Sequence, residues 1–445
     1  MICASAGADI REPDDGSAAV TPRVFLFLQG PSSPIFAKIA DRLEAFGHLC
    51  LRINLNPGDQ IFWRRKGGYN YRGRGGDAWR TYLAAFMDEH DVTDLVLLGE
   101  ERDYHRVAVE IAKTRALDIF VVEMGYLRPD WLTLERGGMS SNSHFPADPN
   151  VIIEAARALP EPRWKRHHTQ SFVAEAAYDL LYNLPNVFLW FLFPHYRRHA
   201  LFHPLAEYAG WVMRLAGSGK RKRVAASTIE ALITDGTPFF VYPLQLQTDF
   251  QLRAHSPYND QREAIDAVLS SFAAHAPKAS RLVIKIHPLD NGLIGWQRFI
   301  TDLTDRLGVG ERVTFLDGGD LNALLAKAEG TVTVNSTVGL SALQMGKPVK
   351  VLGTAIFDII GLSDQAGLDA FWPAPMPPRD DLRVAFFRLL AATIQVRGNF
   401  YSAGGTDAGA DAIARRLHER SVNQPGAFID PPPRQKPQKI NRRHH

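Results

Sequence analysis

Residues 94–126 read DLVLLGEERDYHRVAVEIAKTRALDIFVVEMGY and contain a strand, a helix and a second strand in succession. The runs 94–100 and 118–126 are short and strongly apolar, which is typical of strands buried on both faces of a sheet. Between them, residues 104–114 carry apolar side chains at helical spacing. Because two such strands joined by one helix form a parallel βαβ unit, this stretch predicts an α/β fold.

The same alternation extends outward from this unit. Upstream, the sequence predicts strands at 23–30 and 48–55 and helices at 36–46 and 77–89. The stretch 137–235 interrupts the pattern, since it is aromatic, basic and punctuated by proline. Beyond it, strands are predicted at 238–244, 281–287, 312–316, 330–335 and 349–352, and helices at 263–275, 296–307, 321–328 and 339–345.

This pattern predicts two Rossmann-like domains that face a central cleft, with a helical insertion between them. A chain of 445 residues is also too long for one ordinary core. The expected parts are a disordered N-terminus at 1–22, a first domain at 23–150, a helical segment at 151–235, a second domain at 236–420 and a disordered tail at 421–445. In open α/β sheets, ligands bind beyond the carboxyl ends of strands, so candidate functional residues are sought there.

Composition narrows the class of protein. The formal net charge is +3, which does not indicate a nucleic-acid partner, and two cysteines provide no disulfide framework. The N-terminus lacks the basic start and apolar run of a signal peptide. The longest apolar run is VFLWFLF at 187–193, far shorter than the ~20 residues that cross a bilayer. We therefore expect a cytoplasmic protein without a membrane span.

Two motifs in the second half indicate a phosphate site. Lys285, His287 and Pro288 end a predicted strand, where the imidazole can donate to a phosphate oxygen and Lys285 adds positive charge. Asn335, Ser336 and Thr337 lead from another strand into a helix, a common anion-binding arrangement. A structural His287 and an ordinary helix cap are the alternatives, but together the motifs favour a nucleotide phosphate.

Two carboxylates follow strands of opposite halves. Glu123 follows an apolar run, where an unpaired charge is costly, so it is a candidate general acid or base; a salt bridge to Arg128 is the alternative. Asp249 follows Gln245 and Gln247, whose amides suit sugar hydroxyls; the alternative for Asp249 is a loop cap. No histidine or acidic spacing indicates a metal site, so none is predicted.

The segment 182–223 combines aromatic side chains with clustered cations, including the run KRKR at 220–223. Aromatic residues beside cations suit the surface of an anionic membrane, to which each cation contributes ~1 kcal/mol. A helical subdomain with an aromatic core is the equally weighted alternative. RNA binding is disfavoured, because the neighbouring motifs indicate a small phosphate ligand.

Five runs together resemble the capsule polysaccharide biosynthesis family, in particular its KpsS/LipB-like β-Kdo transferases. These runs are QGP at 29–31, EMGYLRPDWLTLE at 123–135, PLQLQTDFQ at 243–251, KIHP at 285–288 and NSTVGLSAL with GKPV at 335–349. The resemblance spans about 23–365, and the run at 123–135 is its most specific part. It implies the GT-B architecture, in which the first domain binds the acceptor and the second the nucleotide sugar. It also places Gln29, Gly30, Tyr126 and Arg128 at the cleft.

The resemblance further implies CMP-Kdo as donor, transfer with retention, no cofactor and no metal. The acceptor that it implies is a lysophosphatidylglycerol-type lipid, or that lipid already carrying a first Kdo, at the inner membrane, where other capsule synthesis proteins are further expected partners. Retention needs either two inversions or a front-face route. Two inversions need a carboxylate nucleophile, a role we assign to Asp249, with Glu123 as acid/base, although the reverse is possible. The alternatives are another donor, such as CMP-sialic acid or a UDP-sugar, or a non-catalytic export component. The absence of an acidic residue at 339–346 favours CMP over UDP.

Overall fold

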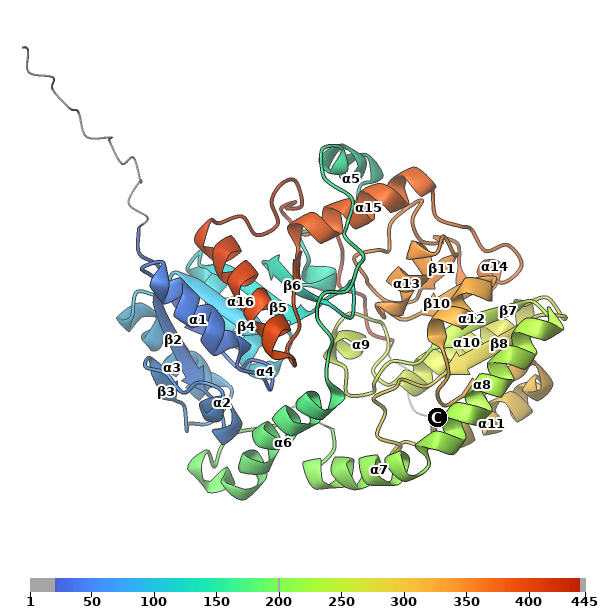
Figure 1. Cartoon of the computed structure of the whole chain (residues 1–445), viewed down its shortest axis with the longest axis horizontal. Helices are drawn as coiled ribbons and strands as arrows, with labels where there is room; N and C mark the ends of the chain where they lie inside the picture. Colours follow the sequence, from blue (N-terminus) through green and yellow to red (C-terminus); the bar gives the residue numbers. More distant parts are fainter. Residues whose placement is uncertain (1–20, 199–200, 441–445) are drawn as a thin grey trace, which may run out of the picture.

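The computed structural model describes residues 21–198 and 201–440. They form two lobes, each built on a β-sheet covered by helices (Figure 1). Of the N-terminal segment expected to be disordered, only Thr21 and Pro22 are described, so that expectation lies outside the described residues.

The first lobe contains a seven-stranded sheet in which five neighbouring strands are parallel. Two antiparallel strands extend it at one edge. Its order is β12 (Gln395–Arg397), β6 (Trp131–Arg136), β5 (Asp118–Met124), β4 (Asp94–Leu98), β1 (Val24–Phe27), β2 (Leu49–Asn54) and β3 (Gly68–Asn70). The central strands are buried along almost their whole length, as their continuous apolar runs predict.

Helices cover both faces of this sheet. The helices α1 (Ile35–Ala45) and α16 (Ala403–His418) pack on one face, and α3 (Asp77–Glu89) and α4 (Asp103–Thr114) pack on the other. The short α2 (Pro57–Ile61) follows β2 and contacts the helical segment between the lobes.

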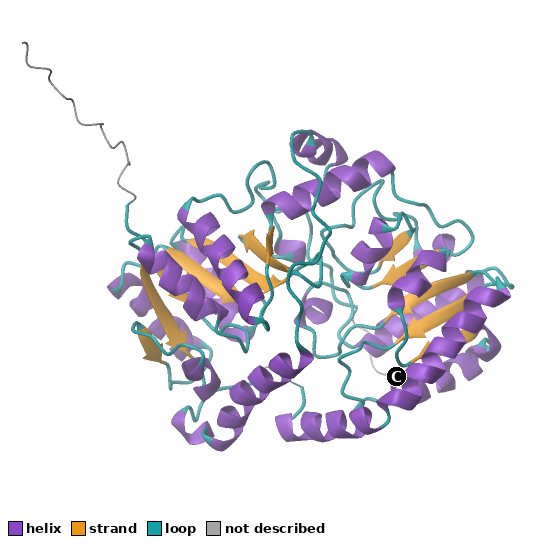
Figure 2. Cartoon of the chain, viewed as in Figure 1, coloured by secondary structure: helices purple, strands orange, loops and turns teal. Residues whose placement is uncertain are grey.

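The second lobe contains a five-stranded sheet that is parallel throughout. Its order is β11 (Val349–Val351), β10 (Gly330–Thr333), β7 (Phe239–Pro243), β8 (Arg281–Lys285) and β9 (Val313–Leu316). One face packs on α10 (Gln261–His275), α11 (Trp296–Leu307) and α14 (Leu368–Phe371). The other packs on α8 (Ser218–Asp235), α12 (Leu321–Lys327) and α13 (Val338–Gln344). The predicted pair of Rossmann-like domains, and with it the GT-B-like fold class, is confirmed (Figure 2).

The segment 151–235 is helical, as predicted, but it is not one unit. It starts within α5 (Pro149–Ala156) and continues through α6 (Phe172–Phe188), the short 3-10 turn η2 (Trp190–Leu192), α7 (Pro204–Ala216) and α8. The first of these helices packs on α15 (Asp380–Thr393), and the last contributes Ala225, Ile229 and Leu232 to the core of the second lobe. Among the described residues, no helix is long and apolar enough to span a membrane.

The C-terminal part differs from the expectation of a second domain that runs to residue 420. After α15 the chain returns to the first lobe, where β12 pairs with β6 and α16 packs on α1 (Figure 1). The physical reason is that α16 has an apolar face, including Ile413 and Leu417, that completes the core over the first sheet. The three residues of β12 are too few to show a pattern in the sequence.

The tail beyond 420 was expected to be disordered, and this is wrong for its described part. The buried guanidinium of Arg434 donates to the carbonyl oxygens of Phe145, Pro146 and Ile356 at 2.6, 3.1 and 2.7 Å. These carbonyls belong to both lobes, and buried carbonyls need donors. The proline-rich tail is therefore ordered by the polar groups that it satisfies. Residues 441–445 lie outside the described part.

Candidate functional site

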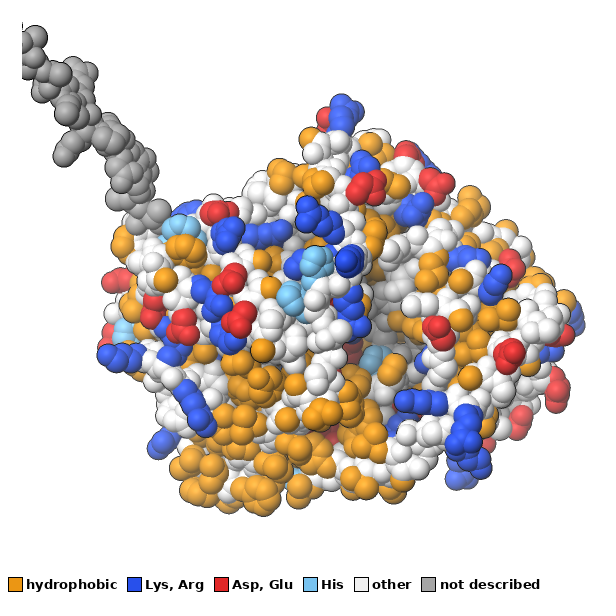
Figure 3. All heavy atoms as spheres, in the orientation of Figure 1, with side chains coloured by type: hydrophobic (Ala, Val, Ile, Leu, Met, Phe, Trp, Pro, Cys, Tyr) orange, Lys and Arg blue, Asp and Glu red, His pale blue; other side chains and the backbone are white. Residues whose placement is uncertain are grey.

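The candidate site lies where the carboxyl ends of strands from both sheets meet. Glu123 is near the end of β5, Asp249 follows β7, His287 follows β8 and Asn335 follows β10. A hydrogen bond of 2.7 Å from the Ser140 hydroxyl to the side-chain oxygen of Gln251 joins the lobes beside them. Figure 3 shows the surface hollowed between the lobes. The predicted residues therefore lie at strand ends, as the sequence indicated, and their role as a functional site stays a prediction.

Glu123 and Asp249 come from opposite lobes and act on each other electrostatically. Burial raises the pKa of Glu123, and the nearby Asp249 carboxylate raises it further. One Glu123 oxygen accepts a hydrogen bond from the Met124 N–H at 3.0 Å. Burial also raises the pKa of Asp249, whose carboxylate caps the short helix α9 (Phe250–Ala254) through the Gln251 N–H at 2.9 Å. The alternative interpretation, in which Asp249 caps a loop, therefore holds for one of its two carboxylate oxygens.

Arg128 is the cation that acts on both carboxylates, alongside Arg102 on Glu123 and Arg253 on Asp249. Its guanidinium favours the ionised forms of both Glu123 and Asp249 and lowers the pKa of His287. Among the described residues it forms no ion pair with Glu123, and its Nε donates to the Gly125 carbonyl at 3.3 Å. The salt-bridge alternative for Glu123 is therefore not what the structure shows. Arg128 instead acts on the groups of both lobes from the space between them.

His287 is held in one orientation and one tautomer. Burial, with Arg128 and Lys285, lowers its pKa to about 4, so the imidazole is neutral near pH 7. Its Nδ1 accepts a hydrogen bond from the Leu289 N–H at 3.0 Å, which leaves the hydrogen on Nε2. His287 can therefore donate to a ligand. Lys285 is buried beside it, within reach of Asp317 and Asp320, and Pro288 is exposed.

Ser336 and Thr337 lie at the start of α13. The Ser336 hydroxyl accepts from the Val338 N–H at 3.3 Å, whereas Thr337 makes no side-chain hydrogen bond to the helix cap. Because α13 has only seven residues, its dipole contributes little. The side-chain groups at 336–337, rather than the helix, are the ligand-binding candidates here.

Three predicted ligand-binding amides are bonded within the protein. The side-chain nitrogen of Gln245 donates to Asn335 at 2.8 Å, and Asn335 donates to the Gln251 carbonyl at 2.8 Å. Gln247 accepts from the N–H of Gln261, at the start of α10, at 2.9 Å. These bonds fix the loop that carries Asp249. Contact of these amides with a sugar nucleotide stays a prediction.

Gln29 lies at the end of β1 in a buried polar network. Its side-chain nitrogen donates to the hydroxyls of Tyr182 and Tyr196 at 2.6 and 3.0 Å, and its oxygen accepts from Arg102 at 3.2 Å. It thereby anchors α6 to the first sheet. Gly30 is required by packing, since an added Cβ would lie 2.8 Å from the Phe36 ring.

Tyr126 also belongs to a buried network. Its hydroxyl donates to Glu135 at 2.9 Å, and the other carboxyl oxygen of Glu135 accepts from Ser143. Burial raises the pKa of Glu135 to about 7 and that of Tyr126 well above its usual value. This network stiffens the turn that presents Arg128.

The structure brings together a cluster between the lobes that the sequence motifs did not indicate. Glu100, Glu101 and His255 bring one ligand atom each to within 4.8 Å of one another, a set that suits a divalent cation. However, the Lys436 ammonium pairs with Glu101 at 2.6 Å and already supplies positive charge. The paired Glu100–Glu101 was visible in the sequence, but its two partners are distant in the chain. The expectation of a metal-free site stays a prediction.

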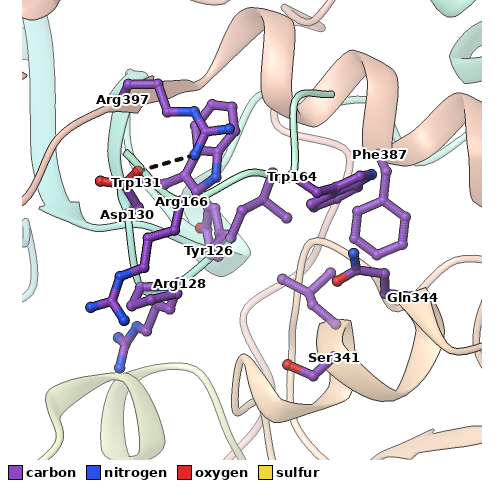
Figure 4. Close-up of a pocket in the computed structure, with 13 residues that line it drawn as sticks. Tyr126, Arg128, Asp130, Trp131, Trp164, Arg166, Ser341, Gln344, Phe387 and Arg397 are labelled. Carbon is purple, nitrogen blue, oxygen red and sulfur yellow. Dashed lines mark hydrogen bonds and ion pairs between the residues drawn. The ribbon is translucent and has the colours of Figure 1, made fainter. Parts of the chain in front are cut away.

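A second missed feature is a pocket beside Arg128 (Figure 4). Asp130, Arg397 and Arg166 line it together with Trp131 and Trp164. Asp130 is buried and accepts from Arg397 at 3.3 Å, and the Arg397 guanidinium lies 3.8 Å from the centre of the Trp131 ring. Since Arg397 is on β12, only the return of the chain to the first lobe brings these groups together.

An apolar surface covers α6, η2 and α7. Figure 3 shows these side chains gathered along one edge of the molecule. Val173 is 76% exposed, Phe188 65%, Trp190 62% and Met213 67%, which is unusual for a single contiguous region. Exposed Lys220, Lys222 and Arg223 begin α8 next to it.

The chain matches one family model and several known proteins. The family model described as capsule polysaccharide biosynthesis protein matches residues 93–401. The capsule polysaccharide export protein KpsS of Escherichia coli is 32% identical over 378 residues, which cover 85% of this chain and 96% of KpsS. The capsule polysaccharide modification protein LipB of Neisseria meningitidis serogroup B is 32% identical over 394 residues, covering 85% of this chain and 91% of LipB. The solved structure of Thermosulfurimonas dismutans KpsC, a beta Kdo 2,7 transferase, aligns at 13% identity with a TM-score of 0.43, covering 89% of this chain and 99% of that one.

Proposed function

Because this chain belongs to the capsule polysaccharide biosynthesis family, we propose that it is a glycosyltransferase that moves Kdo from CMP-Kdo to a lysophosphatidylglycerol-type lipid. Transfer proceeds with retention of configuration and builds the linker of a capsule polysaccharide. The observation that carries this proposal is the convergence of Glu123 and Asp249 from opposite lobes, with the Arg128 guanidinium acting on both carboxylates.

In the first step, an Asp249 oxygen attacks the anomeric carbon of Kdo. The bond from that carbon to the CMP phosphate oxygen breaks, and CMP leaves with the electron pair. A glycosyl-enzyme ester remains, with inverted configuration. Arg128 and Arg253 support this role because both favour the ionised form of Asp249.

CMP is a good leaving group, and its departure needs positive charge and hydrogen-bond donors more than a proton. His287 can supply its Nε2 hydrogen, Lys285 positive charge, and Ser336 and Thr337 their hydroxyls. The lack of an acidic residue at 339–346 supports a CMP rather than a UDP donor. This step uses no metal.

In the second step, the acceptor hydroxyl attacks the same carbon and the ester bond to Asp249 breaks. Glu123 takes the proton of that hydroxyl, and the second inversion restores the original configuration. Burial raises the pKa of Glu123, which makes its carboxylate a stronger base toward the acceptor hydroxyl.

The acceptor is a lipid, and the exposed apolar surface on α6, η2 and α7 supports a peripheral position at the inner membrane. Its aromatic side chains suit the interfacial region, and the cations at the start of α8 suit anionic headgroups. Co-sedimentation with vesicles should require anionic lipid and weaken between 50 and ~300 mM salt, because screening shortens the range of the attraction. Binding that depends on neither would contradict this arrangement.

The test is transfer from CMP-Kdo to fluorescent lysophosphatidylglycerol, followed by mass spectrometry. The wild type should add at least one Kdo. Asp249→Asn should abolish transfer, and Glu123→Gln should accumulate a protein heavier by one Kdo. The matched control, Asp302→Asn on the exposed face of α11, should keep full activity.

Full activity of either cleft variant would exclude the assigned roles. CMP binding without transfer by the wild type would instead favour another donor or a non-catalytic export component.

A further inference from the structure

The pocket beside Arg128 is unusually rich in arginine. Arg128, Arg166 and Arg397 line it, and Asp130 is its only lining carboxylate (Figure 4). Asp130 is already occupied, since its oxygens accept from the N–H groups of His167 and His168 at 2.6 and 3.2 Å as well as from Arg397. The pocket therefore carries an excess of positive charge.

These arginines have donor capacity to spare. The Nη2 of Arg397 is buried and has no hydrogen-bond partner in the part of the chain that the structure describes. Arg128 and Arg166 form no ion pair with any described carboxylate, and each uses its Nε on a backbone carbonyl, of Gly125 and His168. A buried donor without a partner is costly unless a ligand satisfies it.

An aromatic wall holds one of these donors, Arg397, in place. The Trp131 ring lies under the Arg397 guanidinium, and Trp164 packs edge-to-face on Phe387 with ring centres 5.8 Å apart. A guanidinium fixed in this way presents a planar fork that matches the oxygens of a phosphate or carboxylate. The pocket is thus built for an anionic group.

The pocket also adjoins the groups that carry the proposed chemistry. Arg128, which lines it, acts on Glu123, Asp249 and His287. Two of its three arginines, Arg128 and Arg397, belong to the first lobe, whereas the donor phosphate groups assigned above belong to the second. Leu340, Ser341 and Gln344 of α13 line the pocket from the second lobe, so an anion held by the two first-lobe arginines lies against the acceptor-side wall of a pocket that both lobes form.

We propose that this arginine pocket binds the phosphate of the acceptor lipid and thereby positions its hydroxyl toward Glu123. The proposal rests on the proposed function, since it names the site for that acceptor. It assigns Arg166 and Arg397 as acceptor-binding residues, which the sequence motifs did not include. The carboxylate of the donor sugar has anionic oxygens like those of the lipid phosphate and could bind the same arginines. The experiment therefore distinguishes these two groups.

The experiment measures binding without catalysis. Glycerophosphoglycerol, the soluble headgroup, is titrated by calorimetry into wild type, Arg166→Gln and Arg397→Lys, with no donor present. Both variants should weaken headgroup binding about tenfold while the Kd for CMP stays unchanged. Arg397→Lys keeps the charge that pairs with Asp130 but loses the planar fork. Arg157→Gln, an exposed change in the same segment, is the matched control and should bind like the wild type.

Several results would overturn the proposal. One is unchanged headgroup affinity in both variants, and another is no headgroup binding to the wild type at 10 mM. A third is that both variants lose affinity for free Kdo and keep their affinity for the headgroup, which would assign the pocket to the donor carboxylate. Because no donor is present, these outcomes are independent of the transfer assay. Headgroup binding that depends on these arginines, in a protein that does not transfer Kdo, would support the acceptor site. It would count only against CMP-Kdo as the donor.

Discussion

Replacing Glu135 with glutamine is expected to remove a pH-dependent destabilisation of this fold. The carboxyl of Glu135 is fully buried and accepts hydrogen bonds from Tyr126 and Ser143. Burial raises its pKa to about 7, and nearby Glu100 adds to that effect, whereas the two hydroxyls and Arg434 oppose it. Glutamine keeps the shape and an acceptor oxygen but does not titrate.

The magnitude follows from the difference between the two states. The ordinary pKa of the group is 4.5, and in the folded protein it is about 7. Below pH 4.5 the carboxyl is protonated in both states, and its full contribution to stability is present. As the pH rises toward 7, the unfolded chain loses its proton first, so stability falls. At ~1.4 kcal/mol per pKa unit, the loss between pH 5 and pH 8 is about 2–3 kcal/mol.

Urea unfolding followed by far-UV circular dichroism at pH 5, 6, 7 and 8 measures this effect. The free energy of unfolding of Glu135→Gln, relative to the wild type, should increase by about 2–3 kcal/mol from pH 5 to pH 8. The control Glu311→Gln, at an exposed position, should differ from the wild type by less than ~0.5 kcal/mol throughout. A Glu135→Gln difference that is the same at pH 5 and pH 8 would refute the reasoning.

Three further perturbations test other parts of the structure. His287→Ala should weaken CMP binding about tenfold by calorimetry, with partial recovery in His287→Asn, because an amide restores a donor; equal affinities would remove His287 from the phosphate site. The double substitution Trp190→Ser with Phe191→Ser should lower partition into anionic vesicles by at least ~10-fold, because the transfer of each aromatic side chain from water into the membrane contributes more than ~1 kcal/mol. Unchanged partition would show that another surface contacts the membrane. Arg434→Ala should make the tail accessible to trypsin in limited proteolysis, because three buried carbonyls lose a charged donor worth about 1.5–3 kcal/mol each; a tail as resistant as in the wild type would show that these bonds do not hold it.

The fold follows largely from local patterns in the chain. All nine strands expected from apolar runs are present, and the helices α3 and α11 have the predicted bounds. The reason is that a central parallel strand must be apolar on both faces, and an amphipathic helix must repeat its apolar residues every turn. The strands β3 and β12, of three residues each, lie at the two edges of the first sheet, where these requirements are weaker.

The candidate site was partly visible in the same way. Glu123, Asp249 and His287 follow buried strands, and the parallel topology alone brings such positions to one edge of each sheet. The sequence could not show that Gln245, Gln247 and Asn335 bond to partners within the second lobe. Hydrogen-bond partners depend on distances between loops, and spacing along the chain does not encode those distances.

By itself, the sequence determined two α/β lobes, their family and the strand ends at which the carboxylates and the imidazole lie. Only the tertiary structure decided where the C-terminus goes, and with it the pairing of Arg397 with Asp130 and of Lys436 with Glu101. Each of these pairs joins residues more than 260 positions apart. Periodicity reports only the face that each element buries, whereas contacts between distant elements depend on how the apolar faces of the whole chain are covered at once.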